Sequence, residues 1–384
     1  MGTSRMFGPR RVEKSVIQRF ASLNWGIVLA TILIATVGFA MLFSVADGQW
    51  DPWASRHMMR FGIALLLMLA IAVVDIRYWM ALAYPAWFAG ITLLFAVEFI
   101  GDTGMGGQRW LDIGFMRLQP SELMKIAVVM AIARYYHGRT QLQSRSLKSL
   151  LVPGLLLMIP FALVYRQPDL GTAIMIIAGG AATLFLAGVP AWMFVTAAVG
   201  VVPLAFAIWP FLNTYQQNRV LTFFNPESDP LGAGYQITQS KIALGSGGMT
   251  GKGFLEGTQS HLNFLPEMKT DFIFTVLVEE FGLMGATIVL GLYGIVLSYG
   301  LLIGIGCRNQ FGRLLASGLA IALFLYVMIN VGMVMGLLPV VGVPLPLISW
   351  GGSSMLTWMI AYGLILSVSV HRHVTIAPRG SGIV

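Results

Sequence analysis

Long apolar stretches recur along the chain, separated by short polar connections that carry most of the charged residues. A helix needs roughly 20 residues to cross the hydrocarbon core of a bilayer, and ten stretches reach or approach that length. Their approximate bounds are 25–45, 58–74, 79–100, 120–133, 149–165, 170–189, 191–212, 272–305, 314–338 and 344–370. These runs lack the period-two alternation of a membrane β-barrel. The pattern therefore predicts an all-α polytopic membrane protein with about ten transmembrane helices.

Composition supports this class. Of the 384 residues, 57% are hydrophobic and only 10% are charged, whereas about a quarter are charged in ordinary soluble domains. The single cysteine, Cys307, excludes an internal disulfide framework. The net charge of +8 does not indicate a nucleic-acid partner, because the basic residues lie at predicted helix ends rather than in one cluster. The apolar stretch 25–45 is too long for a signal-peptide core, so it is predicted to be a retained first span.

The positions of the basic residues predict the orientation in the membrane, since cytoplasmic loops carry an excess of Lys and Arg. We expect both termini in the cytoplasm; in the inner membrane of a bacterium, the chemistry would then lie on the periplasmic side. The predicted parts are a cytoplasmic tail over 1–24, a ten-span domain over 25–371 and a second cytoplasmic tail over 372–384. The basic residues on the predicted cytoplasmic side include Arg77, Arg134, Arg139, Arg145, Lys148, Arg308, Arg313, Arg372 and Arg379.

The longest connection, residues 213–271, is polar and glycine-rich and lies on the predicted periplasmic side. Its alternating apolar and polar residues favour an ordered, partly helical loop. Near its end, Glu267 and Asp271 lie at the membrane boundary, immediately before an apolar run. A half-desolvated carboxylate at such a boundary is suited to act as a general base. The alternative is that Asp271 only caps the eighth helix, and local sequence leaves both interpretations open.

A second polar constellation precedes the fourth span. Trp110 is interpreted as an interfacial anchor, and Pro120 fits the first turn of the helix that follows. Glu122 and Lys125 are three residues apart, so they share one face of that helix. Charges inside a span are costly, and they are expected to pair or to line a wet cavity. A structural ion pair and the floor of an outward-facing cavity are both compatible with this spacing.

Two further motifs carry polar groups at predicted helix ends. Asp169, between the fifth and sixth spans, is a helix cap or a carboxylate that orients a neighbouring arginine. The run Gly351-Gly352-Ser353-Ser354 either presents backbone N–H groups to a pyrophosphate or allows close helix packing. Prolines and glycines over 330–354 predict irregular backbone, which a membrane protein tolerates only where it lines a cavity or is buried.

The order and combination of these segments resemble the shape, elongation, division and sporulation family, from the first span to the last. The segments are GQRWLDIGFMRLQPSELMK, RQPDLGTA, RVLTFFNPESDPLGAGYQITQSKIALGSGGMTGKG, TQSHLNFLPEMKTDFIF and LPVVGVPLPLISWGGSS. Within the family the chain is more similar to elongation proteins than to division proteins. Trp350 is one departure, since the family more often has tyrosine there. The resemblance implies a peptidoglycan glycosyltransferase that polymerises lipid II during cell elongation.

The resemblance also implies roles for individual residues. The family's essential aspartate corresponds to Asp271, which we expect to act as general base in an inverting reaction. The acidic and basic residues of the QPSExxK motif correspond to Glu122 and Lys125, and the loop tryptophan corresponds to Trp110. Together with Glu267, these residues are predicted to bind substrate.

The leaving pyrophosphate requires positive charge, for which Arg109, Lys125, Arg219 or a divalent cation (Mg²⁺ or Mn²⁺) are the candidates. The implied partners are a class B penicillin-binding protein, other elongation-complex proteins, the membrane and lipid II. Two other functions fit ten spans and buried charges: a lipid II flippase and a non-catalytic scaffold of the cell-wall complex. Neither needs a base, so Asp271 is the residue that discriminates them from a polymerase.

Overall fold

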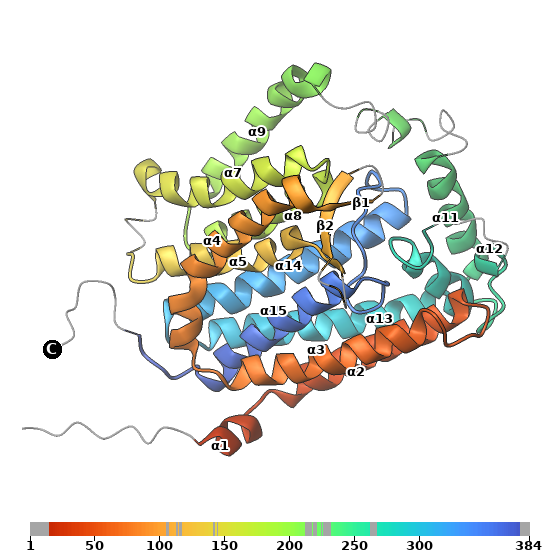
Figure 1. The fold of residues 1–384 in the computed structure, drawn as a ribbon, viewed down its shortest axis with the longest axis horizontal. Coiled ribbons are helices and arrows are strands. Elements are labelled where there is room, and N and C mark those ends of the chain that lie inside the picture. Colours follow the sequence, from red (N-terminus) through yellow and green to blue (C-terminus); the bar gives the residue numbers. More distant parts are fainter. Residues whose placement is uncertain are drawn as a thin grey trace, which may run out of the picture.

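The protein is a bundle of long, roughly aligned helices, shown as a computed structural model in Figure 1. The structure describes residues 15–104, 107–112, 114, 117–140, 143, 145–211, 217, 221–223, 225, 232–261 and 267–376. The α-helices are α1 (Val16–Ala21), α2 (Trp25–Val45), α3 (Ala54–Val73), α4 (Ile76–Ile100), α5 (Pro120–Tyr136), α7 (Leu151–Arg166), α8 (Leu170–Leu186), α9 (Ala191–Ile208), α11 (Ala233–Gly247), α12 (Thr258–His261), α13 (Ile273–Ile305), α14 (Gln310–Val334) and α15 (Gly352–Val370). The short elements are the 3-10 helices η1 (Leu147–Leu150) and η2 (Trp209–Phe211) and the strands β1 (Asp102–Gly104), β2 (Gly107–Asp112) and β3 (Arg117–Leu118).

The helices confirm the polytopic all-α class. In the described chain, seven helical segments are long and apolar enough to cross a membrane: α2, α3, α4, η1 with α7, α13, α14 and α15. The helices α5, α8 and α9 are shorter, at 17, 17 and 18 residues, and occupy the other three predicted spans. Each of the ten apolar stretches therefore contains a helix.

The tenth helix begins later than its hydropathy predicts. The apolar run starts at residue 344, whereas α15 starts at Gly352, because the preceding segment carries prolines and left-handed residues. Gly342 and Leu347 have φ values of 71° and 65°, which no helix accommodates. This irregular backbone is buried against protein, since Leu345 and Leu347 are each 1% exposed. A departure from helix is tolerated there because the segment is shielded from lipid.

The helix α13 contains a break that the hydropathy pattern does not reveal. Its backbone leaves the helical region at Gly282 (φ 62°, ψ −161°). Two carbonyls before the break and two N–H groups after it bond instead to the backbone of loop 248–253, at 3.0–3.1 Å. The loop thus replaces the helical hydrogen bonds that the break removes. A buried polar backbone group without a partner is costly, so loop and helix stabilise each other.

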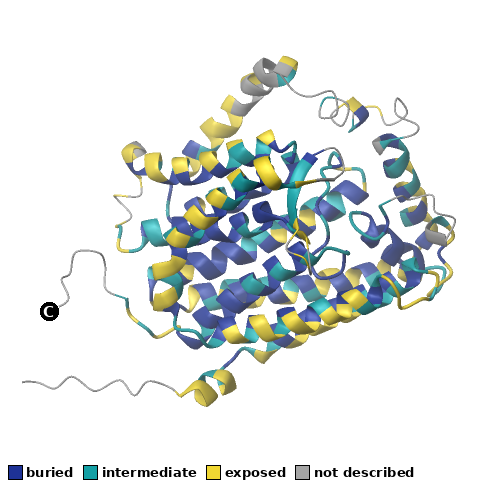
Figure 2. Ribbon diagram, viewed as in Figure 1, coloured by how far each residue is buried: buried dark blue, intermediate teal, exposed yellow. Residues whose placement is uncertain are grey.

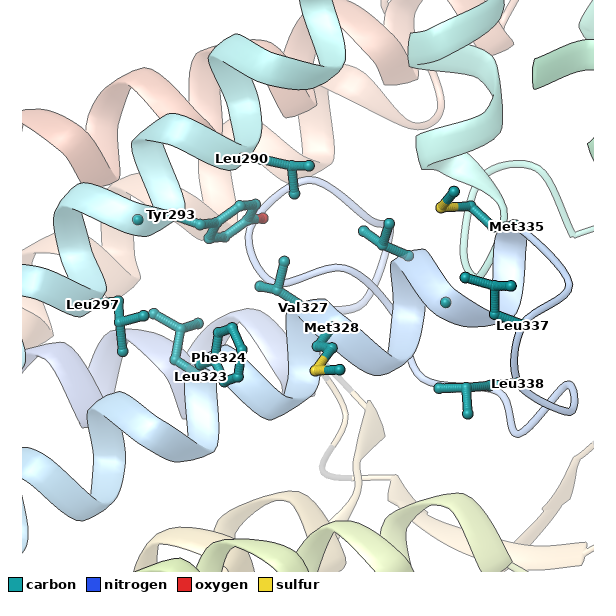
Figure 3. A pocket seen from close by; sticks show the side chains of 13 residues that line it. Leu290, Tyr293, Leu297, Leu323, Phe324, Val327, Met328, Met335, Leu337 and Leu338 are labelled. Atoms are coloured by element: carbon teal, nitrogen blue, oxygen red, sulfur yellow. The ribbon is translucent and has the colours of Figure 1, made fainter. Parts of the chain in front are cut away.

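Burial divides the helices into an inner and an outer set (Figure 2). In α15, 83% of the residues of the most apolar 18-residue window are buried, against 28% for the equivalent windows of α4 and α13. The exposed faces of the outer helices are apolar, as expected where lipid is the solvent. A groove of about 520 Å³ between α13 and α14 is lined by side chains such as Leu290, Phe324 and Met328 (Figure 3). Its lining is almost wholly apolar, so the chemistry must lie elsewhere.

The connection from α4 to α5 forms a small antiparallel sheet in the order β1-β2-β3. The first ladder ends where Gly104 pairs with Gly107. The pair Leu111 and Leu118 aligns β3 with β2 and so leads the chain directly into Pro120 of α5. This sheet sets the direction in which α5 enters the bundle.

Candidate active site

Segments far apart in the sequence meet where α5, α8 and α15 begin. The backbone N–H of Gln119, the N-cap of α5, donates to Ser353 Oγ (3.1 Å), and Ser353 Oγ donates to Arg117 O (2.7 Å). These bonds join the sheet and α5 to the first turn of α15. The Gln119 side chain donates to Asp169 Oδ2 (2.8 Å), which joins α5 to α8. Three helix N-termini are thereby held together by polar contacts.

Asp169 takes one of the two roles that its sequence context suggests, that of a helix cap. Its Oδ1 accepts a hydrogen bond from Thr172 N (3.2 Å), so it caps α8. Its other oxygen holds the amide of Gln119 rather than an arginine. The neighbouring Arg166 points elsewhere, with Nε 3.8 Å from Glu98 Oε1. The arginine interpretation is therefore wrong, because a buried carboxylate that is 6% exposed is satisfied here by neutral donors.

Asp271 lies in the turn that leads into α13. Asn330 of α14 donates from Nδ2 to Asp271 O (2.9 Å) and to Val343 O (2.7 Å), and so ties this turn to the irregular segment before α15. A Cβ added to Gly342 would lie 3.4 Å from Asp271 Oδ2, so a glycine keeps this approach open. The N-cap of α13 is Phe272, so Asp271 directly precedes the cap position. Asp271 is partly exposed at the head of the helix.

Glu122 and Lys125 form the predicted ion pair, with Lys125 Nζ 2.7 Å from Glu122 Oε1. Tyr326 of α14 completes a triangle, because its hydroxyl donates to the same oxygen (3.0 Å) and accepts from Lys125 Nζ (2.9 Å). The two charged side chains are only 5% and 10% exposed. Among the described groups, Glu122 Oε2 has no hydrogen-bond partner. The ion pair is therefore buried, and Glu122 Oε2 remains available as a hydrogen-bond acceptor.

These groups form one electrostatic cluster. The Tyr326 hydroxyl interacts with the charges of Glu122, Asp169 and Asp271, and Lys125 interacts with Glu122 and Asp169. The cluster therefore combines carboxylates, an ammonium and a hydroxyl inside the bundle, beside the turn that carries Asp271.

The structure gives Arg109 and Trp110 positions in β2. The Arg109 guanidinium donates to the carbonyls of Gln167 (3.0 Å) and Pro168, which fastens the sheet to the turn between α7 and α8. The structure thus engages Arg109 with backbone rather than leaving it as an open cation. Trp110 is partly buried and pairs with Asp102 in the ladder.

Glu267 stabilises the turn that carries the candidate base. Its Oε2 accepts from Thr270 Oγ1 (2.7 Å), and its backbone carbonyl accepts from Phe272 N (3.2 Å). The side chain therefore organises the turn from within. Arg219, predicted to bind the pyrophosphate, lies outside the described residues.

Sequence reasoning missed three residues that hold the cluster together: Gln119, Tyr326 and Asn330. The last two stand inside an otherwise apolar run, and a polar side chain in a span marks a functional or packing site. That signal was available for Asn330, which is fully buried. Gln119 is the first residue of the QPSExxK motif, but it precedes the span and its partner is 50 residues away.

The expected divalent cation finds no preformed set of ligands among the described residues. No group of three or more His, Cys, Asp or Glu side chains is arranged there to hold a metal. The carboxylates of Glu122 and Asp169 are already engaged by Lys125 and Gln119.

Comparison with known proteins places the chain in a family. The family model described as "Cell cycle protein" (FtsW, RodA and SpoVE) matches residues 18–374. The chain is 44% identical over 347 residues to the peptidoglycan glycosyltransferase MrdB of Escherichia coli K12, covering 90% of this chain and 93% of that protein. It is 34% identical to the stage V sporulation protein E of Bacillus subtilis over 355 residues, covering 89% and 96%.

Two solved structures have the same fold. A chain of a peptidoglycan synthase complex, solved for its coordination of polymerization and crosslinking, matches with a TM-score of 0.79 at 31% identity, covering 91% of this chain and 98% of that one. The crystal structure of the rod shape determining protein RodA of Thermus thermophilus matches with a TM-score of 0.69 at 28% identity, covering 92% and 98%. The sequence motifs, the fold and these relatives agree, and the chain belongs to the FtsW, RodA and SpoVE family of shape, elongation, division and sporulation proteins.

Proposed function

We propose that this chain is a peptidoglycan glycosyltransferase that polymerises lipid II into glycan strands during cell elongation. The observation that carries the proposal is the position of Asp271, a partly exposed residue at the head of α13 beside a buried polar cluster. The names of the relatives support the reaction class, since MrdB is a peptidoglycan glycosyltransferase.

The proposed reaction needs one carboxylate base. The 4-hydroxyl of the acceptor sugar attacks the anomeric carbon of the donor, the new C–O bond forms, and the bond to the pyrophosphate oxygen breaks. Asp271 accepts the hydroxyl proton, and the lipid pyrophosphate leaves with the electron pair. An α-linked donor giving a β-linked product requires inversion, so no covalent intermediate is needed. A positioned base of this kind contributes about 10²–10⁴-fold to the rate.

The surrounding residues support the base rather than the leaving group. Asn330 and Glu267 hold the turn that carries Asp271, while Glu122, Lys125 and Tyr326 form a rigid floor. A divalent cation is part of the proposal only as a companion of the pyrophosphate.

We further propose that the site faces the periplasm of the inner membrane, with both termini cytoplasmic. Figure 1 supports this orientation in part, because α1 and the end of α15 lie at the same end of the bundle. A class B penicillin-binding protein is the proposed partner, supported by the similar chain in a peptidoglycan synthase complex. The lipid part of the substrate would remain in the bilayer, which explains why the enzyme is itself a membrane bundle.

Glycan polymerisation from purified lipid II tests the proposal, with the partner protein present. Asp271→Asn preserves shape and removes the base, so polymerisation should fall about 10²–10⁴-fold. The matched control is Asp112→Asn, an exposed carboxylate of β2 whose oxygen accepts from Gly114 N and is retained in the amide. Equal product from Asp271→Asn and wild type would refute the role of Asp271. Lipid II crossing liposomes without polymer formation would favour the flippase, and no activity of either kind would favour the scaffold.

A further inference from the structure

A groove between α3 and α15 is lined by none of the residues of the carboxylate cluster. It has a volume of about 420 Å³ and is mainly apolar, with Met59, Ile63, Met355 and Leu356 among its walls. Met59 and Ile63 are 61% and 64% exposed, so the groove opens on the lipid-facing surface of the bundle. Its dimensions and lining suit one or more hydrocarbon chains.

Two arginines stand at one end of this groove. Arg56 and Arg60 are one helical turn apart on α3, so their like charges repel each other. Neither forms an ion pair with any acidic residue that the structure describes, and the groove is lined by no such residue. Guanidinium groups at a lipid-facing surface are stable when an anion accompanies them. The charge pattern therefore calls for an anionic ligand.

Two helix N-termini reinforce this positive field. The helix α3 begins at Ala54, and its N-cap, Trp53, makes no side-chain cap bond. The helix α15 begins at Gly352 and likewise has no side-chain cap. A Cβ added to Gly352 would lie 3.4 Å from Arg60 Nη1, so the start of α15 reaches this guanidinium. Both helix dipoles present their positive ends to the arginines.

A ladder of aromatic and cationic side chains connects the arginines to the candidate base. The Arg60 guanidinium lies 4.6 Å from the centre of the Trp350 ring, and Trp350 packs edge-on against Trp53 at 5.1 Å. The Lys269 ammonium covers the other ring, 4.1 Å from the centre of Trp53. Trp350 N also donates to Lys269 O (2.8 Å), two residues before Asp271. These contacts link the arginines of the groove to the turn of the candidate base.

We infer that this groove binds an isoprenoid phosphate or pyrophosphate, with the phosphate on Arg56 and Arg60 and the chain between α3 and α15. The inference rests on the proposed function and adds the site of the lipid phosphate. The two arginines form no ion pair with a described acidic residue, and their positive charge complements that phosphate. Connection to the turn of Asp271 favours a substrate lipid over a bulk phospholipid.

The first test compares steady-state polymerisation by the partner-bound enzyme with Arg60→Gln and Arg56→Gln/Arg60→Gln. Loss of a charge-assisted contact should raise KM for lipid II roughly ten- to hundredfold, with a much smaller change in kcat. Arg60→Lys keeps the charge and should recover part of the affinity. The matched control is Arg77→Gln, which changes an exposed arginine in the first turn of α4 and should leave KM unchanged. Unchanged KM in folded Arg56→Gln/Arg60→Gln protein overturns the inference.

The second test measures binding without turnover, so its outcome does not depend on the proposed reaction. Undecaprenyl phosphate and phosphatidylglycerol are each titrated into the full-length protein in phosphatidylcholine nanodiscs. We expect wild type and Arg77→Gln to bind undecaprenyl phosphate, and Arg56→Gln/Arg60→Gln to lose at least tenfold in affinity. Equal binding of phosphatidylglycerol would overturn the assignment to a substrate lipid. Binding that is lost in the double variant while wild type makes no polymer would refute the proposed function and leave the lipid-phosphate site standing.

Discussion

The ion pair between Lys252 and Glu279 anchors the loop before α12 to the break in α13, and its removal should loosen that anchor. Lys252 Nζ lies 2.6 Å from Glu279 Oε1, which also accepts from Thr258 Oγ1 (3.1 Å) and from Gln259 N (3.0 Å). The Glu279 side chain is 1% exposed, whereas that of Lys252 is 25% exposed. The variant Lys252→Met keeps the length of the side chain and deletes its charge. It leaves a buried carboxylate with neutral donors only.

The expected cost follows from this geometry. Removing one partner of a buried ion pair destabilises a protein by about 3–5 kcal/mol, and the partial exposure of Lys252 places this variant near the lower end. A loss of that size lowers Tm by several degrees, roughly 5 °C for a chain of this length. The double variant Lys252→Met/Glu279→Gln removes both charges, and the amide oxygen still accepts from the loop. It should recover to within about 1 kcal/mol of wild type.

Thermal unfolding of the detergent-solubilised protein measures both variants, with Lys148→Met as an exposed-lysine control. Hydrogen exchange over residues 247–261 measures the local effect, which should be faster in the single variant because the loop backbone opens more often. The reasoning is refuted if Lys252→Met unfolds at the temperature of wild type. It is also refuted if the double variant is as unstable as the single one, since the loss would then not come from an unpaired carboxylate.

Three further outcomes are expected. Gly282→Ala should lower Tm, because alanine at φ 62° is strained by about 1–3 kcal/mol and its methyl group would lie 2.6 Å from Met249 C. A rise in Tm, as expected for this substitution in a regular helix, would contradict the break in α13. Gly171→Ala should reduce polymerisation, since its methyl group would meet Val341 O and displace the segment beside Asp271; wild-type rates would contradict this. Burial raises the pKa of the Cys307 thiol, so N-ethylmaleimide at pH 7.5 should modify it only after unfolding; rapid labelling of the native protein would contradict its burial.

The helices were predictable because the bilayer imposes a single solution on a long apolar run. Backbone polar groups in lipid must bond within the segment, so such a run is helical wherever it lies. The first span was predicted at 25–45, and α2 occupies Trp25–Val45. The tenth was predicted to begin at 344 and begins at Gly352, because hydropathy does not register the backbone limits of proline and left-handed residues.

The pair Glu122 and Lys125 was also predictable, since both residues lie on one turn of one helix and need no other segment to meet. The cap formed by Asp169 was predictable for the same reason, because its partner Thr172 is three residues away. The remaining contacts of the site are not local. Tyr326 reaches Glu122 across 204 positions of the chain, and Asn330 joins two loops that the sequence separates.

The sequence by itself therefore determined the class of the protein, the ten apolar stretches that contain helices and the family, and it singled out Asp271 as the candidate base. Hydropathy, spacing and motif order carry these properties, because each depends on residues that are close together in the chain. Only the tertiary structure decided that loop 248–253 completes the broken helix α13, that Arg109 is held by backbone carbonyls, and that two arginines face an apolar groove. These features depend on distances between segments that packing brings together, and no local pattern encodes such distances.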